Sequence, residues 1–380
     1  MHSDTVTLFL GGDVMLGRGI DQILAHPGDP TLREPLVTDA HDYVALAERA
    51  NGSIPRPVDF RWPWGIALEI LDRAAPDARI INLETSVTHR GEFEPDKQVH
   101  YRMAPENLPA LEIARPDVCT LANNHVLDFG RPGLRETLAV LSGAGLTTAG
   151  AGGDAGAARR PATIPVDGGG RVVVVAVGMA SSGIPWSWAA TGDRAGVNLL
   201  PAWPGAARDV VDPLRQGRRD GDVVVISLHW GTNWGHEITR QQRALAHALI
   251  DGGVDVVFGH SSHHPRLIEV HRGRLILYGC GDLINDYEGI SGHEEHRGDL
   301  RLLYLASIRA DTGVLAALRM VPLRARRLRL ERASTRDTRW LGATLDLVSR
   351  PFGSRITVTS GDELELEWDG GRRAGVARSS

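Results

Sequence analysis

The chain has 380 residues, with 42 basic and 47 acidic side chains and a net charge of −5. Hydrophobic residues make up 42% and charged residues 23%, proportions of a globular protein that exclude a wholly disordered chain. The acidic balance argues against a dedicated nucleic-acid-binding protein, because phosphate contacts need a concentrated basic surface. Lys97 is the only lysine, so neither Schiff-base chemistry nor a phosphate-binding loop that ends in Gly-Lys is expected.

Cysteine content and the start of the chain indicate the compartment. Cys119 and Cys280 are the only cysteines, too few for a disulfide framework or a thiolate zinc site. The first residues lead into a strand pattern without the features of a signal peptide, and no apolar run approaches the roughly 20 residues of a membrane helix. We therefore expect a cytoplasmic protein without a membrane anchor. The sequence does not indicate its oligomeric state.

Short Val- and Ile-rich runs alternate with amphipathic segments along most of the chain, which predicts an α/β fold. In chain order we predict strand 6–10, helix 65–75, strands 79–83 and 118–122, helix 134–143, strand 171–177, helix 206–218, strand 223–228, helix 241–251, and strands 254–258 and 275–278. A β-rich pattern follows, with strands 302–308 and 314–322, helix 335–348, and strands 355–358 and 364–368. We predict a main domain over residues 1–300 and a β-rich C-terminal extension over residues 301–380 that packs on it.

Polar residues follow five of the predicted strands, at Asp13, Asn82-Leu83-Glu84, Asn123-Asn124-His125, His229 and His260–His264. Loops that leave the carboxyl ends of strands meet at one edge of an α/β sheet, so these side chains are expected to converge. Carboxylate, amide and imidazole ligands together suit Zn, Mn or Fe. Because no cysteine lies near these loops, the pattern favours a catalytic site that retains water over a structural zinc site.

Each of these residues also has a purely structural explanation. Asp13 suits a turn or a helix N-cap, and Glu84 could pair with one of the many arginines. Asn123-Asn124 suits a left-handed turn, and His229 a hydrogen-bonded histidine of the core. The coincidence at five strand ends favours a metal site, as do three histidines within five residues after one strand: His260, His263 and His264.

These motifs resemble those of the CapA-type poly-γ-glutamate biosynthesis proteins, which belong to the calcineurin-like metallophosphoesterase superfamily. The resemblance covers roughly residues 5–287, and its motifs are Gly12-Asp13-Val14-Met15-Leu16-Gly17-Arg18, Asn82-Leu83-Glu84, Ala122-Asn123-Asn124-His125 with Asp128 and Gly130, His229-Trp230-Gly231, the His260/His263 segment, and Tyr278-Gly279 with Gly281-Asp282. It implies a four-layer α/β/β/α sandwich with two divalent metal ions (Zn, Mn or Fe) at one edge.

The resemblance also implies roles for individual residues. The metal ligands would be Asp13, Glu84, Asn124, His229, His260 and His263, with Glu84 bridging both ions and a hydroxide held between them. His125 would donate a proton to the leaving group and Asp128 would orient it, although His125 also suits a hydrogen-bonded turn. Arg18, Asn82 and Trp230 are expected to contact the substrate, although tryptophans near His229 could equally pack beneath the loops.

The chain departs from the family pattern at three places. Met15 stands where phosphoesterases have a histidine, a substitution shared by CapA-type proteins, so the first metal should be bound more weakly. Ser261-Ser262 lacks the usual proline, which leaves open whether His263 or His264 is the ligand. The segment 286–297 is unusually charged, and it suits either a solvated surface or the lining of a substrate groove.

These observations favour a metal-dependent hydrolase acting on an anionic polymer or small molecule. The bond attacked would be a γ-glutamyl or poly-γ-glutamate-like amide, or a phosphoester. The alternative is a non-catalytic, polymer-binding accessory protein of capsule biosynthesis. A third possibility, amide-bond formation with an activated donor, lacks a nucleotide-binding loop in the sequence.

Overall fold

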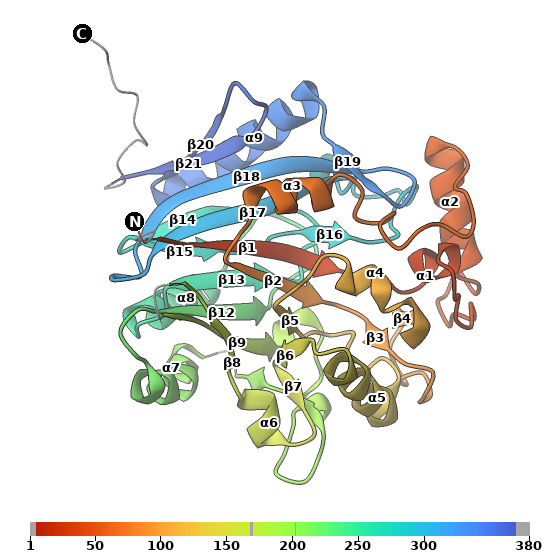
Figure 1. Ribbon diagram of the computed structural model, residues 1–380, viewed down its shortest axis with the longest axis horizontal. Coiled ribbons are helices and arrows are strands. Elements are labelled where there is room, and N and C mark those ends of the chain that lie inside the picture. The colour runs from red at the N-terminus through yellow and green to blue at the C-terminus, as the bar shows by residue number, and fades with distance from the viewer. Residues whose placement is uncertain (1–4, 168–169, 202, 370–380) are drawn as a thin grey trace.

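The structure is a computed structural model, and it describes residues 5–167, 170–201 and 203–369. It is a mixed α/β fold with two large β-sheets, and its C-terminal part is rich in strands (Figure 1). The predicted strands and helices are all present, with ends shifted by a few residues. No helix in these ranges is long and apolar enough to cross a membrane.

The larger sheet contains the first and the last strands of the chain. Its order is β20 (Ser354–Val358), β21 (Leu364–Trp368), β18 (Leu315–Ala325), β17 (Leu300–Arg309), β1 (Thr5–Val14), β2 (Ala78–Leu83), β5 (Val118–Thr120) and β6 (Thr147–Ala149), with β16 (Asp282–Ile284) beside β1 and β19 (Leu330–Arg332) beside β18. β1, β2, β5 and β6 are parallel, whereas β17 pairs antiparallel with β1. The segment after residue 300 therefore continues the main sheet edge to edge. The sequence pattern predicted instead an extension that packs on the main domain.

The second sheet has the order β11 (Leu199–Leu200), β9 (Arg171–Met179), β12 (Asp222–His229), β13 (Val256–His260), β15 (Arg274–Leu277) and β14 (Ile268–His271), with β8 (Ala162–Pro165) beside β9. β9, β12, β13 and β15 are parallel. Parallel strands are covered on both faces, which explains the unbroken valine run of β9. Two short pairs complete the strands: β3 (Ser86–Val87) with β4 (Arg102–Met103), and β7 (Ala151–Gly152) with β10 (Gly196–Val197).

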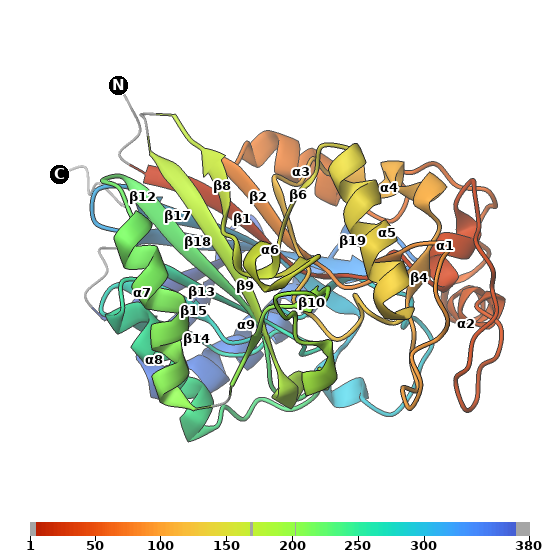
Figure 2. The ribbon, with the colours of Figure 1, turned by 90° about the horizontal axis from the view of Figure 1, so that it is seen from below.

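The helices are α1 (Gly19–Ile23), α2 (His41–Asn51), α3 (Ala67–Ala74), α4 (Pro109–Glu112), α5 (Gly130–Gly143), α6 (Ala155–Arg159), α7 (Ala207–Gly217), α8 (Arg240–Asp251) and α9 (Thr335–Ser349). Figure 2 shows α7 and α8 together beside the second sheet, with α5 toward the opposite end of the molecule. A capping box between Thr239 and Gln242 starts α8, and the Ser334 side chain caps α9.

Alternating side chains of the strands divide the core. Leu8 and Leu10 of β1 share one buried cluster with Val223 and Val225 of β12, so the two sheets contact each other. Phe9, whose side chain leaves the opposite face of β1, belongs instead to a cluster with α3 and α5. The outer face of the second sheet is buried with α7 and α8. Because successive side chains of a strand point to opposite faces, each central strand is covered on both sides.

Candidate metal centre

The ends of four parallel strands bring the predicted site residues to one edge of the molecule, on the side to which their arrowheads point in Figure 1. Asp13 on β1 is in register with Asn82 on β2, and His229 on β12 is in register with His260 on β13. Gly12 allows this arrangement, since a Cβ there would lie 1.9 Å from the carbonyl oxygen of Gly281. The backbone N–H of Asp13 donates to that same carbonyl at 3.1 Å.

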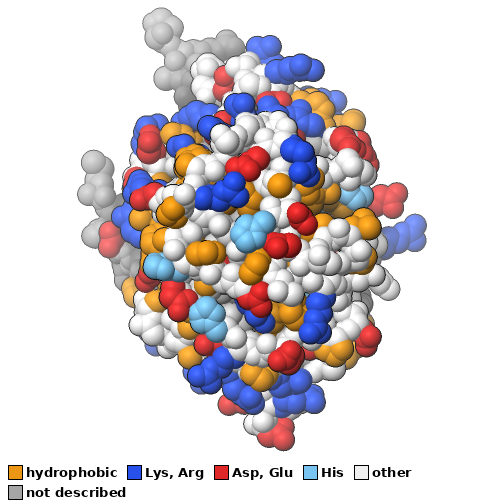
Figure 3. All heavy atoms as spheres, turned by 90° about the vertical axis from the view of Figure 1, so that its right-hand side faces the viewer, with side chains coloured by type: hydrophobic (Ala, Val, Ile, Leu, Met, Phe, Trp, Pro, Cys, Tyr) orange, Lys and Arg blue, Asp and Glu red, His pale blue; other side chains and the backbone are white. Residues whose placement is uncertain are grey.

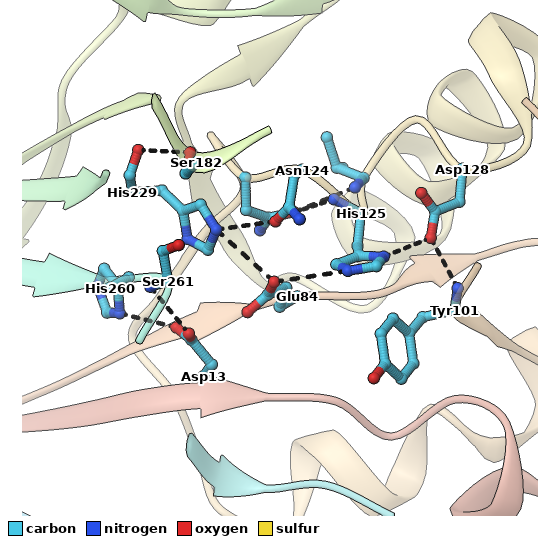
Figure 4. A network of polar contacts seen from close by, with 12 residues as sticks. Asp13, Glu84, Tyr101, Asn124, His125, Asp128, Ser182, His229, His260 and Ser261 are labelled. Carbon is cyan, nitrogen blue, oxygen red and sulfur yellow. Dashed lines mark hydrogen bonds and ion pairs between the residues drawn. The ribbon is translucent and has the colours of Figure 1, made fainter. Parts of the chain in front are cut away.

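Asp13, Glu84 and His229 each offer a ligand atom, and the three atoms lie within 4.8 Å of one another. All three side chains are buried. His260 Nδ1 lies 2.9 Å from Asp13 Oδ1, and His229 Nε2 lies 2.8 Å from Asn124 Oδ1. Figure 4 shows these side chains turned toward the same space from different strands and the loops that follow them. Five of the six predicted ligands therefore come together.

The backbone of Ser261 helps to hold Asp13. Its N–H donates to Asp13 Oδ2 at 3.1 Å, and Figure 4 draws this hydrogen bond as a dashed line. Ser261 has a φ of 87°, in the left-handed region that residues with a Cβ rarely adopt. Backbone strain of this kind persists where surrounding contacts enforce it, and it is concentrated at functional sites. The loop after β13 is thus shaped around the Asp13 carboxylate.

The two buried carboxyl groups have opposite protonation behaviour. Burial alone would raise the pKa of Asp13, but His260 and His229 beside it hold that pKa well below its ordinary value. Burial and the negative charge of Asp13 raise the pKa of Glu84 well above its ordinary value. Burial lowers the pKa of His229 to about 3, which keeps its imidazole neutral and able to act as a ligand.

Several ligand atoms of this cluster lack partners. Across the described ranges, Glu84 Oε2 and both ring nitrogens of His260 make no hydrogen bond, although they are buried. The short contact between His260 and Asp13 therefore has poor hydrogen-bond geometry. Buried polar atoms without a partner are costly, and a cation among them would remove that cost. The mixed oxygen and nitrogen donors suit a divalent ion such as Zn, Mn or Fe.

His125 lies beside the cluster and is held from behind. Its Nε2 is 3.8 Å from Glu84 Oε1, and its Nδ1–H donates to Asp128 Oδ2 at 2.6 Å. Tyr101 donates its backbone N–H to the same Asp128 oxygen at 2.7 Å. Burial and the nearby charge of Lys97 lower the pKa of His125 well below its ordinary value. Burial raises the pKa of Asp128 to about 6 although Lys97 opposes it.

Comparison with known proteins agrees with this arrangement of motifs. The profile of the family described as bacterial capsule synthesis protein PGA_cap matches residues 7–287. The chain belongs to this family. The resemblance found in the sequence motifs is thereby confirmed.

Several relatives of this PGA_cap chain have names that refer to polymer or capsule biosynthesis. The probable polyglutamine synthesis accessory protein Rv0574c of Mycobacterium tuberculosis (strain ATCC 25618 / H37Rv) is 54% identical, over 96% of this chain and 97% of that protein. The PGA biosynthesis protein CapA of Bacillus subtilis (strain 168) is 26% identical, over 74% of this chain and 64% of that protein. The capsule biosynthesis protein CapA of Bacillus anthracis is 22% identical, over 75% of this chain and 61% of that protein.

The three residues expected to contact the substrate are placed differently from the metal ligands. Asn82 is buried, and its side-chain N–H donates to Asp13 Oδ1 at 2.8 Å, so it positions a metal-ligand candidate. Trp230 is 1% exposed and stacks on Tyr278 within the core on the helix side of the second sheet. Of the two interpretations of Trp230, structural packing agrees with the structure, because core side chains enclose its indole.

Arg18 is buried and already neutralised. Its guanidinium donates to Asp286 at 3.1 Å and to Glu34 at 2.8 Å, and it lies 3.8 Å from the centroid of the Tyr43 ring. Two carboxylates and an aromatic face thus surround the cation. We expected Arg18 to contact the substrate, but its contacts with Glu34 and Asp286 make it a support for the loops around the site.

The histidine pair after β13 separates in space. His263 Nδ1 lies 3.0 Å from Asp282 Oδ1, on the side of the metal centre. His264 turns away and packs against the rings of His236 and His296. Of the two, His263 is the one placed near the centre, and it reaches Asp282 instead of the cluster of Asp13, Glu84 and His229.

Two further site residues were not predicted as such. Lys97, the single lysine, contacts Asp128 Oδ1 and the backbone carbonyl of Asn124, and its Nζ lies 3.0 Å from His125 Nδ1. Asp282 lies near enough to Glu84 to help raise the pKa of that group. The rarity of lysine in this chain was the available signal for Lys97, and the motif Tyr278-Gly279 with Gly281-Asp282 was the available signal for Asp282.

The charged segment 286–297 lines a cavity. This cavity has a volume of about 300 Å³, and residues that line it include Tyr287, Trp234, Arg297 and Arg301. Tyr287 also contacts the site, because its ring packs on His263 and its hydroxyl accepts from Tyr101 at 2.7 Å. Both interpretations of this segment hold in part, because it lines the cavity while residues 289–295 are exposed to solvent.

Proposed function

We propose that this protein is a metal-dependent hydrolase that acts on an anionic substrate, with a γ-glutamyl or poly-γ-glutamate-like amide or a phosphoester as the bond attacked. The observation that carries the proposal is the buried cluster of Asp13, Glu84 and His229, with unpartnered donor atoms, next to the His125–Asp128 pair. The implied architecture is the four-layer α/β/β/α sandwich, with the centre at the carboxyl ends of the strands.

The cluster fits two divalent ions by its donor types. Asp13, Glu84, Asn124, His229 and His260 would hold them, and Glu84 would contribute to both. The ions would supply a nucleophile from water and neutralise charge on the attacked group. His263 and Asp282 lie beside this set, and their mutual contact would orient an imidazole at its margin.

The chain supplies proton transfer through His125. Asp128 accepts the Nδ1–H at 2.6 Å, so a transferred proton would be carried at Nε2, the nitrogen that lies on the Glu84 side. Lys97 holds Asp128 and the Asn124 carbonyl, and it thereby fixes both ends of the loop that carries His125. A negatively charged substrate beside Nε2 would raise the lowered pKa of His125 toward the range that proton donation needs.

The substrate class is inferred from the relatives and from the cavity beside the site. The relatives' names concern poly-γ-glutamate and capsule biosynthesis, which favours a polymer of carboxylates. Arg297, Arg301 and Arg324 line the adjacent cavity and are suited to bind carboxylates, although Glu288, Glu294 and Asp299 line it as well. These arginines also pair with protein carboxylates or amides, so a substrate would have to share them.

A second function is favoured by one specific observation. The relative at 54% identity bears the name of an accessory protein, which favours a non-catalytic, polymer-binding role in capsule biosynthesis. In that case the cluster would hold metal ions that shape a binding surface, and His125 would serve only to order its loop.

Turnover assays separate the two functions. The purified protein, loaded with Zn²⁺ or Mn²⁺, is incubated with poly-γ-glutamate and, separately, with simple phosphomonoesters and phosphodiesters. We expect metal-dependent turnover of one class. Asp13→Asn should abolish it, and His125→Asn should lower kcat by about a hundredfold or more. His41→Ala, at an exposed histidine whose ring contacts Asp39, is the matched control and should retain full activity.

The outcomes are distinct. Turnover of the amide polymer or of the phosphoesters identifies the bond. Retention of poly-γ-glutamate on the protein without metal-dependent turnover of either class would refute the hydrolase and support the accessory role.

A further inference from the structure

His236, His264 and His296 form a second group, separate from the cluster of Asp13, Glu84 and His229. His236 follows β12, His264 follows β13, and His296 ends the short 3₁₀ helix η5 (Glu294–His296). Each offers one ring nitrogen, and the three nitrogens lie within 4.8 Å of one another. Figure 3 views this end of the molecule, where histidine side chains reach the surface among acidic and apolar ones.

The available ring nitrogens are consistent with ligation. His264 Nδ1 lies 3.1 Å from the carbonyl oxygen of Pro265, so it carries the proton and leaves Nε2 with a free lone pair. In the part of the chain that the structure describes, His264 Nε2, His236 Nδ1 and His296 Nδ1 are buried atoms without a hydrogen-bond partner. A backbone carbonyl that fixes the second ring nitrogen is the usual arrangement behind a histidine that binds a metal.

Stacking alone does not account for the three rings. The rings of His264 and His296 are parallel with centroids 4.4 Å apart, but His236 meets His264 edge-on at 4.5 Å. The ring of Trp234 stacks on that of His296, with centroids 5.6 Å apart and an interplanar angle of 23°. Aromatic packing would leave three buried nitrogens unpaired, whereas a shared cation would satisfy all three at once.

We propose that His236, His264 and His296 form a separate zinc site, with water as the fourth ligand. Three imidazoles without a carboxylate suit Zn²⁺, whereas Mg²⁺, Mn²⁺ and Ca²⁺ prefer oxygen ligands. The donor set thus differs from that of Asp13, Glu84 and His229, and the proposal does not depend on the hydrolase.

The position of the site gives it a structural consequence. It would join the loop after β12 to the segment around η5, two parts of the chain about 60 residues apart in sequence. Trp234 lies between this site and the cavity that it lines with His293 and Arg297. Bound zinc would therefore hold one wall of that cavity, and the loop after β12 is already tied by Arg266, whose guanidinium donates to the Thr232 carbonyl at 2.6 Å.

Zinc stoichiometry in a suitable background tests the proposal. The full chain carrying Asp13→Asn, Glu84→Gln and His229→Asn is stripped with a chelator and dialysed against Zn²⁺. We expect it to retain about one zinc per chain, and to take up little Mn²⁺. Adding His236→Ala and His296→Ala should remove that zinc. His293→Ala, which removes a ring that stacks on Trp234 but is outside the trio, is the matched control and should retain it.

Cobalt gives a second readout that does not depend on counting metal. Co²⁺ in this background should show the visible absorption of a four-coordinate site, and the same His236→Ala, His296→Ala pair should abolish it. Both residues are only partly buried, so the substitutions should leave the fold intact, which circular dichroism would verify. Absence of zinc from the background protein, or zinc retained after loss of His236 and His296, would overturn the proposal.

Discussion

Replacement of Glu84 by glutamine should make the metal-free protein more stable at neutral pH. The folded-state pKa of Glu84 lies well above its ordinary value of 4.5, because the carboxyl is buried and faces Asp13. Above pH 4.5 the unfolded chain loses this proton while the folded chain keeps it, so stability falls as pH rises until the folded pKa is reached. Glutamine does not titrate and carries no charge into the core.

The size of the effect follows from the same linkage. At about 1.36 kcal/mol for each pH unit above 4.5, the gain at pH 7 is at most about 3.4 kcal/mol. We expect about 1 to 3 kcal/mol, since relaxation around the site reduces the limit. Near pH 4 the variant and the parent protein should unfold at similar urea concentrations.

Urea unfolding in the presence of a chelator measures the difference, with Glu365→Gln at an exposed position as the matched control. A divalent metal should stabilise the parent protein and have a smaller effect on Glu84→Gln. A Glu84→Gln variant less stable than the parent at pH 7 without metal, with Glu365→Gln unchanged, would refute the reasoning. It would mean that protein partners hold the carboxylate in its ionised form.

Three further predictions concern the surroundings of the centre. Lys97→Met should lower the free energy of unfolding by about 2 to 4 kcal/mol, because the buried carboxylate of Asp128 loses its partner. It should also raise the pKa of His125, because the charge of Lys97 no longer repels the protonated imidazole. Urea unfolding and NMR titration of the imidazole measure the two effects, and Lys97→Arg should restore part of both. The contribution of His229 to the stability of the metal-free protein should fall by about 2 kcal/mol between pH 6.5 and pH 5, because its folded pKa is about 3 and the unfolded chain takes up the proton first. The raised pKa of Glu84 acts in the opposite direction over this range, so the quantity to measure is the difference in unfolding free energy between the parent and His229→Asn at each pH. A difference that does not change with pH would contradict the assignment. Arg18→Met should lower the free energy of unfolding by about 3 to 5 kcal/mol, since it leaves two buried carboxylates without their cation. A variant as stable as the parent would contradict the supporting role of Arg18.

The metal-ligand candidates could be predicted because they are polar residues at the ends of apolar, strand-like runs. Asp13, Glu84 and His229 each follow a short buried run, and the parallel arrangement of those runs brings their ends to one edge. Trp230 follows His229 just as closely, yet it is enclosed by the core. Consecutive residues at a strand end point to opposite sides, and the sequence did not show which side faced the helices.

The amino-acid sequence alone determined the order of strands and helices, the family, and the candidate metal ligands at the strand ends. These follow from local periodicity and from motifs whose members lie within a few residues of one another. The tertiary structure decided what depends on distant contacts. It joined β17 to β1, enclosed Arg18 between Glu34 and Asp286, placed Lys97 behind His125, and sent His264 to a group separate from His263. Burial and the neighbours of a charge arise only when remote segments pack, so no local pattern encodes them.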